Sequence, residues 1–284
     1  MTRLTATSRF QLENRQLPDE VLTETIMTIA SHASVRHYKP DPVPRAHVEA
    51  ILTAARSAST SSNLQMYSII VVTDPKRREE LAALSGDQDH VREAPLLLVF
   101  CPDLHRLERV CARQGYPFED RYTEMFMQAV VDAALAGQNA ALAAESLGLG
   151  ICFIGAIRNH PLEVARLLKL PPRTFALFGL TVGYPAREPR IKPRLPQEVT
   201  VHWEEYSDAG LEEGLAAYDA TMAATGIYKN REVAVPPTVR TPGQDAPAAA
   251  RIYGWCEHSA RRMARAHPLR RHIKQALEQL GWEF

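Results

Sequence analysis

A long alanine-rich stretch, residues 121–147, constrains the fold of this 284-residue chain more than any other feature. Alanine is the best helix former, and small side chains let a helix axis approach its neighbours closely. The apolar part of this region, residues 125–149, is interrupted by polar residues that a helix inside a bilayer would rarely tolerate, Gln128, Asp132, Gln138, Asn139 and Glu145. We therefore expect a central, buried helix and no membrane-spanning segment.

The composition is that of an ordinary globular protein. Apolar residues make up 45% of the chain and charged residues 23%, with a formal net charge of zero, so no global field attracts DNA or an acidic membrane. The four cysteines form no Cys-x-x-Cys pair, which argues against a zinc site and favours a reducing compartment. The first 14 residues hold no continuous apolar core, so we expect a cytoplasmic protein without a secretory signal.

Hydrophobic periodicity predicts interspersed helices and strands. Besides the long helix, we expect helices at 18–31, 44–56, 76–84, 161–168, 208–224, 255–266 and 268–280, and strands at 67–73, 96–101, 151–155 and 175–183. The long helix does not fit a regular βαβ alternation, which favours an α+β fold over a doubly wound sheet.

We expect the chain to form a single domain overall, which consists of a core and an arm. The core would comprise residues 1–205, and residues 206–284 would form a helical arm that packs on the core or on a partner. Within the arm, the proline-rich residues 235–247 should be extended.

Two basic segments carry groups that bind phosphate. If the run from His32 to Tyr38 is extended, Ser34 and Arg36 project to the same side, as donors to one phosphate must. In Lys192-Pro193-Arg194, proline fixes an extended backbone, so the two cations share a face. The alternative for each segment is an exposed, solvated loop.

A polar cluster and a small-residue turn could contact a planar ligand. Residues 59–62 are Ser-Thr-Ser-Ser, a dense set of hydroxyls that suits a heterocycle or simply forms a flexible turn. Gly155-Ala156 follows an expected strand and could expose backbone amides, or make a tight turn. The run Gly148 to Phe153 lacks the third glycine of a dinucleotide fingerprint, and we interpret Gly148 as a helix C-cap.

Seven motifs in this order resemble the nitroreductase superfamily, most closely the oxygen-insensitive NADPH nitroreductases and NADPH-flavin oxidoreductases. The resemblance covers roughly residues 22–230 and is carried by Ser-Val-Arg-His-Tyr (34–38), Ala-Arg-Ser-Ala-Ser-Thr-Ser-Ser (55–62), Gln-Asp-His-Val (88–91), Ala-Ala-Glu-Ser-Leu-Gly-Leu-Gly (143–150), Phe-Ile-Gly-Ala-Ile-Arg-Asn (153–159), Leu-Phe-Gly-Leu-Thr-Val-Gly-Tyr-Pro (177–185) and Ile-Lys-Pro-Arg-Leu-Pro (191–196).

The resemblance implies a homodimer with a central, mostly antiparallel sheet and one FMN per subunit near the dimer interface, in which the long helix lies. The FMN-binding part is then the core. By position, the phosphate and ribityl ligands are expected to be His32, Ser34, Arg36, Lys192 and Arg194. Polar contacts to the ribityl chain and ring are expected from Thr60, Ser61, Ser62 and Gln88, and the turn near the ring from Ile154, Gly155 and Ala156.

The resemblance also places residues on the donor and acceptor side. Lys229 and Arg231 could meet the 2′-phosphate of NADPH, and Arg270 aligns with an arginine on the family's substrate side. Asn63 stands where the family often has an aromatic residue, which alters the substrate face.

The implied activity is an FMN-dependent transfer of electrons from NADPH to small acceptors such as nitroaromatics, quinones or flavins, by two-electron ping-pong steps. No side-chain nucleophile and no metal is needed, because the cofactor carries the chemistry. One alternative is a flavin reductase that supplies reduced FMN to a partner monooxygenase, and another is a flavin-binding protein without catalytic turnover. Residues 251–274 hold seven basic side chains against one acid, but no nucleic-acid motif, so we expect no nucleic-acid partner.

Overall fold

The computed structural model describes residues 8–13, 16–229, 253–264 and 267–284. The chain divides into two compact units, one comprising Met1–Gln11, Arg15–Ile191 and Pro268–Phe284 and the other Leu12–Asn14 and Lys192–His267. The expected roles of a core (1–205) and an arm (206–284) stay a prediction.

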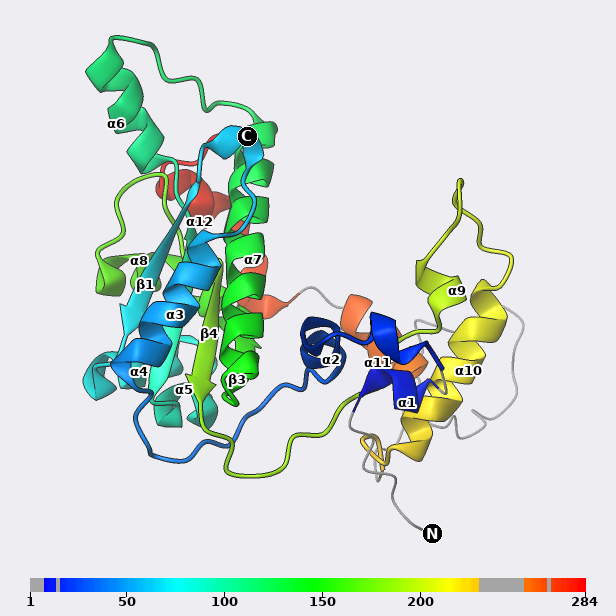
Figure 1. Ribbon diagram of the computed structural model, residues 1–284. Coiled ribbons are helices and arrows are strands. Elements are labelled where there is room, and N and C mark those ends of the chain that lie inside the picture. The colour runs from blue at the N-terminus through cyan, green and yellow to red at the C-terminus, as the bar shows by residue number, and fades with distance from the viewer. Residues whose placement is uncertain (1–7, 14–15, 230–252, 265–266) are drawn as a thin grey trace. The chain divides into compact units, whose positions relative to one another are not determined.

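The first unit is built on a four-stranded antiparallel sheet with the order β1-β2-β4-β3 (Figure 1). The strands are β1 (Tyr67–Val72), β2 (Leu96–Pro102), β3 (Gly150–Ile154) and β4 (Phe178–Gly183). Each neighbouring pair is antiparallel, with Ile69 opposite Phe100 and Ile154 opposite Gly179. The predicted α+β class and the four expected strands are confirmed.

Helices precede, connect and follow the strands. They are α1 (Arg9–Leu12), α2 (Glu24–Ala30), α3 (Arg45–Arg56), α4 (Pro75–Leu84), α5 (Asp89–Glu93), α6 (His105–Gln114), α7 (Thr123–Ser146), α8 (Pro161–Leu168) and α12 (Ile273–Gln279), with 3-10 turns at Asp19–Val21, Ser61–Asn63, Gly155–Asn159 and Pro268–Arg270. The helix expected at 18–31 is broken, because the Thr23 hydroxyl caps a new helix by accepting from the Ile26 N–H. The helix expected at 268–280 is likewise a 3-10 turn followed by α12.

Strand β2 lies at the centre of the core and is buried on both faces. Leu96, Leu98 and Phe100 pack on the face covered by α3 and α7, whereas Leu97 and Val99 pack on the face covered by α4 and α8. Figure 1 shows α3 and α7 running along the sheet on the same side. The sheet is therefore the middle of three layers, which explains its continuous apolar strands.

The alanine-rich helix is α7, and it is confirmed as a central element. Its buried side is made of small residues that lie against the sheet, Ala129, Ala133, Ala136, Gly137, Ala140, Ala141 and Ala144. A Cβ on Gly137 would lie 2.6 Å from ring carbons of Phe178, so glycine permits the close approach of α7 to β4. None of the helices among the described residues is long and apolar enough to cross a membrane.

The second unit contains α9 (Gln197–Thr200), α10 (Leu211–Ala224) and α11 (Trp255–Met263). Helices α10 and α11 pack through Tyr218 and Trp255, whose ring centroids lie 5.1 Å apart. The Asp219 carboxylate accepts a hydrogen bond of 2.8 Å from the Cys256 N–H at the start of α11. The expected extended segment, residues 235–247, lies outside the described residues.

Candidate functional site

The segment before β3 presents the first group of predicted ligands. Val35 donates its N–H to the Ile151 carbonyl at 2.8 Å, which seats the segment beside β3. Ala33 and Val35 are buried, whereas Ser34 and Arg36 are exposed. The alternation confirms that Ser34 and Arg36 project to the same side, away from the core.

His32 is held by two neighbours that local sequence patterns do not reveal. Its ring Nδ1 lies 2.6 Å from Glu145 Oε1 in the last turn of α7, and Arg9 donates to its carbonyl at 3.0 Å. Because a carboxylate accepts from Nδ1–H, the other ring nitrogen, Nε2, is the one left to meet a ligand. Glu145 thereby orients the His32 ring and leaves its Nε2 free of this hydrogen bond.

Gln88 lies in a strained loop against the turn that follows β3. Gly86 and Asp87 have φ of +78° and +52°, and Gln88 donates its side-chain N–H to the Ser85 carbonyl at 2.6 Å. A Cβ on Gly86 would lie 3.9 Å from Ala156 Cβ and 4.0 Å from Gln88 Nε2. Gly86 therefore packs against the turn with Ala156, which places the loop that carries Gln88 beside that turn.

Arg36, from the segment that pairs with β3, also influences this loop electrostatically. His90, the second residue of α5, is buried, and its pKa is lowered by burial and then by the positive charge of Arg36. Arg36 thus lies within electrostatic reach of the loop that carries Gln88.

The turn after β3 is a short 3-10 helix, and the guanidinium groups of Arg158 and Arg270 lie at it. Ile154 is buried, Gly155 and Ala156 are half-buried, and Arg158 donates to the Leu177 carbonyl. Burial, and secondarily the charge of Arg270, lowers the pKa of Arg158. Arg270 itself donates to Asn159 Oδ1 at 2.9 Å. The expected substrate-side arginine therefore lies at the same turn as Gly155 and Ala156.

The Ser/Thr cluster is placed elsewhere. It forms the loop before β1, whereas the Gly155 turn follows β3, and β1 and β3 are the two outer strands of the sheet. Three strand spacings separate these edges, about 14 Å. Within one chain, the structure does not bring Thr60, Ser61 and Ser62 to the Gly155 turn.

The loop that carries the cluster is anchored by a residue that the sequence analysis did not single out as a site residue. Asp132 on α7 is 1% exposed, and its two carboxylate oxygens accept from the backbone N–H groups of Ser61 (2.9 Å) and Met66 (3.0 Å). A lone carboxylate on an alanine-lined helix face is the signal that could have indicated it, because a buried charge needs partners.

The second unit holds the other predicted cations. Lys192 and Arg194 are exposed, and the Pro193 carbonyl between them accepts from the Tyr218 hydroxyl at 3.2 Å. These residues line a pocket of about 460 Å³ together with Tyr218, Met222, Ile227, Tyr228, Trp255 and His258. Lys229 is exposed at the end of this described stretch, and Arg231 lies outside the described residues.

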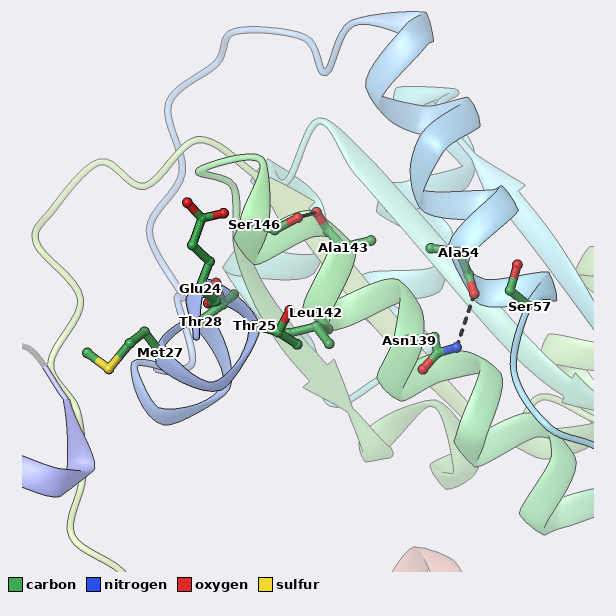
Figure 2. Close-up of a pocket in the computed structure, with 10 residues that line it drawn as sticks. All are labelled: Glu24, Thr25, Met27, Thr28, Ala54, Ser57, Asn139, Leu142, Ala143 and Ser146. Carbon is green, nitrogen blue, oxygen red and sulfur yellow. Dashed lines mark hydrogen bonds between the residues drawn. The ribbon is translucent and has the colours of Figure 1, made fainter. Parts of the chain in front are cut away.

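A larger pocket, about 740 Å³, lies on the first unit between α2, α3 and α7. Figure 2 shows Asn139 reaching from α7 to α3, where it donates to the Ala54 carbonyl at 3.2 Å. Leu142 and Ser146 line the same pocket from α7. None of the predicted ligands lines it, so this pocket is not part of the predicted FMN site.

Comparison with known proteins places this α+β fold in a class of FMN-dependent oxidoreductases. Residues 29–184 match the nitroreductase family and residues 192–284 its C-terminal domain. The chain belongs to the nitroreductase family, as its motifs indicated.

Individual relatives agree. Over 204 residues it is 46% identical to an oxygen-insensitive NADPH nitroreductase of Salmonella typhimurium, covering 71% of this chain and 82% of that protein. An FMN reductase (NADPH) of Bacillus subtilis is 42% identical, with 74% and 85% covered. The solved structure of NfrA2 from B. megaterium superposes with a TM-score of 0.81 at 32% identity, covering 92% of this chain and 99% of that one.

Proposed function

We propose that this protein is an FMN-dependent oxidoreductase that takes hydride from NADPH and reduces nitroaromatics, quinones or flavins in two-electron steps. Membership of the nitroreductase family supports this activity, as do the relatives that are an NADPH nitroreductase and an NADPH-dependent FMN reductase. The single structural observation that carries it is that the segment with Ser34 and Arg36 pairs with β3, the strand that leads into the Gly155 turn.

The donor set at this place fits FMN. Ser34 and Arg36 offer a hydroxyl and a guanidinium for an anionic phosphate, and the start of the Gly155–Asn159 turn offers backbone amides for a planar ring. The residues proposed to hold FMN are His32, Ser34, Arg36, Thr60, Ser61, Ser62, Gln88, Ile154, Gly155, Ala156, Lys192 and Arg194. When bound, FMN supplies the two-electron redox chemistry between NADPH and the acceptor.

The protein's own residues bind and orient. The Glu145 carboxylate keeps the His32 ring in one orientation, and Ser85 holds the amide of Gln88. Arg158 and Arg270 place positive charge at the Gly155 turn, which favours anionic acceptors and negative charge that develops there. Arg270, Asn63, Lys229 and Arg231 are proposed for the substrate and NADPH side.

We also infer a homodimer. The cluster Thr60–Ser62 lies at the opposite sheet edge from the Gly155 turn, so a second copy is needed for both to contact one FMN. Helix α7 carries an exposed apolar stripe, Met127, Val131 and Leu135, which continues into Asn139 and Leu142 of the larger pocket. A solvated monomer rarely exposes such a continuous stripe, and a second copy would cover it. The cysteines, which form no Cys-x-x-Cys pair, are consistent with the cytoplasmic location that we propose.

The phosphate assignment is tested with Arg36→Ala and Arg194→Ala, each made singly. Loss of one charge-assisted hydrogen bond to phosphate should weaken FMN binding by about tenfold or more. Arg166→Ala, which removes an exposed arginine on α8, is the matched control and should bind FMN like the wild type. Unchanged FMN affinity in both test variants would contradict the assignment.

The flavin reductase alternative is kept because one relative is an FMN reductase. NADPH oxidation is measured with a nitroaromatic, a quinone and free FMN as separate acceptors. A preference for free FMN, with bound flavin that exchanges during turnover, would favour the alternative. Slow oxidation with every acceptor would instead favour a flavin-binding protein without turnover.

A further inference from the structure

The loop before β1 is strained. Ser62, Asn63 and Gln65 have φ of +48°, +57° and +53°, in the left-handed region that residues with a side chain rarely adopt. Three such residues within four positions persist only where the surroundings determine the conformation. The loop also carries the hydroxyls of Ser61 and Ser62, which are proposed to contact FMN.

Asp132 holds the N–H groups at the two ends of this loop. Its Oδ1 accepts from the Ser61 N–H at 2.9 Å and its Oδ2 from the Met66 N–H at 3.0 Å, so one side chain fixes both ends. The carboxylate is 1% exposed on a helix face otherwise lined by alanine. Burial of a charge is unfavourable unless hydrogen bonds satisfy it, and here the loop supplies them.

Arg106 on α6 holds the carbonyl groups of the same loop. It donates to the Gln65 carbonyl at 2.8 Å and to the Tyr67 carbonyl at 3.0 Å. The Asp132 carboxylate therefore accepts from backbone N–H groups, and the Arg106 guanidinium donates to backbone carbonyl groups. Together they satisfy backbone groups at both ends of a loop whose only regular structure is one short 3-10 turn, Ser61–Asn63.

We propose that Asp132 is a positioning residue for FMN binding, which holds the loop Thr60–Gln65 so that Ser61 and Ser62 are presented to the cofactor. Arg106 supports the same loop from its carbonyl side. A carboxylate is needed because both of its oxygens accept, whereas the amide of asparagine would direct N–H at one of the two backbone N–H groups. The inference rests on the proposed function.

The test compares Asp132→Asn and Asp132→Ala with the wild type. FMN affinity of each apoprotein is measured by fluorescence titration, and the free energy of unfolding of each apoprotein by urea. We expect FMN binding to weaken by about tenfold in the asparagine variant, equivalent to about 1.4 kcal/mol, and further in the alanine variant. The matched control is Asp120→Asn, because Asp120 is also buried and is paired with Arg173 rather than with the loop.

Asp120→Asn should lower stability but leave FMN affinity unchanged. The inference is overturned if the Asp132 variants bind FMN like the wild type, or if all three variants lose affinity in proportion to lost stability. Arg106→Gln serves as a second variant that should fold, since this side chain is 49% exposed, and should bind FMN about threefold more weakly. Wild-type affinity in that variant counts against the inference. Failure of the wild type to bind FMN would instead overturn the proposed function.

Discussion

Glycine at position 137 decides how closely the longest helix approaches the sheet. An added Cβ would lie 2.6 Å from two ring carbons of Phe178, although alanine is the better helix former. Gly137→Ala should therefore destabilise the protein by about 1–3 kcal/mol, the usual cost of overpacking a core. Ala134→Ser, on the exposed side of α7, is the control and should change the free energy of unfolding by less than about 0.5 kcal/mol. Urea unfolding checks both, and a more stable Gly137→Ala variant would contradict the close contact.

His90 should make stability depend on pH. Burial and the charge of Arg36 lower its pKa in the folded protein below the ordinary value, so the unfolded chain binds the proton more readily. Stability is then fully present above the ordinary histidine pKa and is lost as pH falls toward the lowered pKa. The decrease in unfolding free energy between pH 7.5 and 5.5 should be smaller in His90→Asn than in the wild type. An equal decrease in both proteins would show that His90 does not contribute.

Residue type and local spacing predict the side on which a side chain lies when a segment is extended. Ser34 and Arg36 alternate with buried neighbours, as an extended segment requires. Asp132, Glu145 and Arg106 were missed as supporting residues because their roles depend on partners 38 to 113 positions away in the chain, which local patterns do not encode.

At the scale of elements, burial determined which predictions succeeded. Strand β2 is buried along its length and helix α7 along one face, which leaves apolar or small-residue runs that sequence patterns reveal. Helix α6 was not predicted. It buries none of its residues, and its sequence is rich in charged side chains, so it lacks the strongly apolar run that marks a core element. Strand β4 begins at Phe178 rather than at 175, since Phe175 and Leu177 pair with β2 carbonyls outside the regular ladder.

The exposed stripe of α7 allows a test of the homodimer. Val131 is 53% exposed in the single chain, and a glutamate there would be buried unpaired if a second copy covers the stripe. Val131→Glu should shift the protein from dimer to monomer in sedimentation velocity at micromolar concentration. Val110→Glu, at an equally exposed position on α6, should stay dimeric. A dimer that survives Val131→Glu would place the interface elsewhere.

For the whole molecule, family membership was predictable because several motifs occur in the expected order along much of the chain. The matches to the family and its C-terminal domain begin at residues 29 and 192, and the second compact unit also includes Lys192. The physical separation of the Ser/Thr cluster from the Gly155 turn was not predictable, because it follows from strand order across the sheet.

The central claim is that bound FMN accepts electrons from NADPH in this protein. The most direct measurement is an anaerobic titration of the purified protein with NADPH, and separately with NADH, followed through the flavin absorbance band. We expect the band to bleach completely at one equivalent of NADPH per flavin, without a radical band, and less readily with NADH. A colourless protein that cannot be reconstituted with FMN, or a flavin band that NADPH leaves unchanged, would contradict the account.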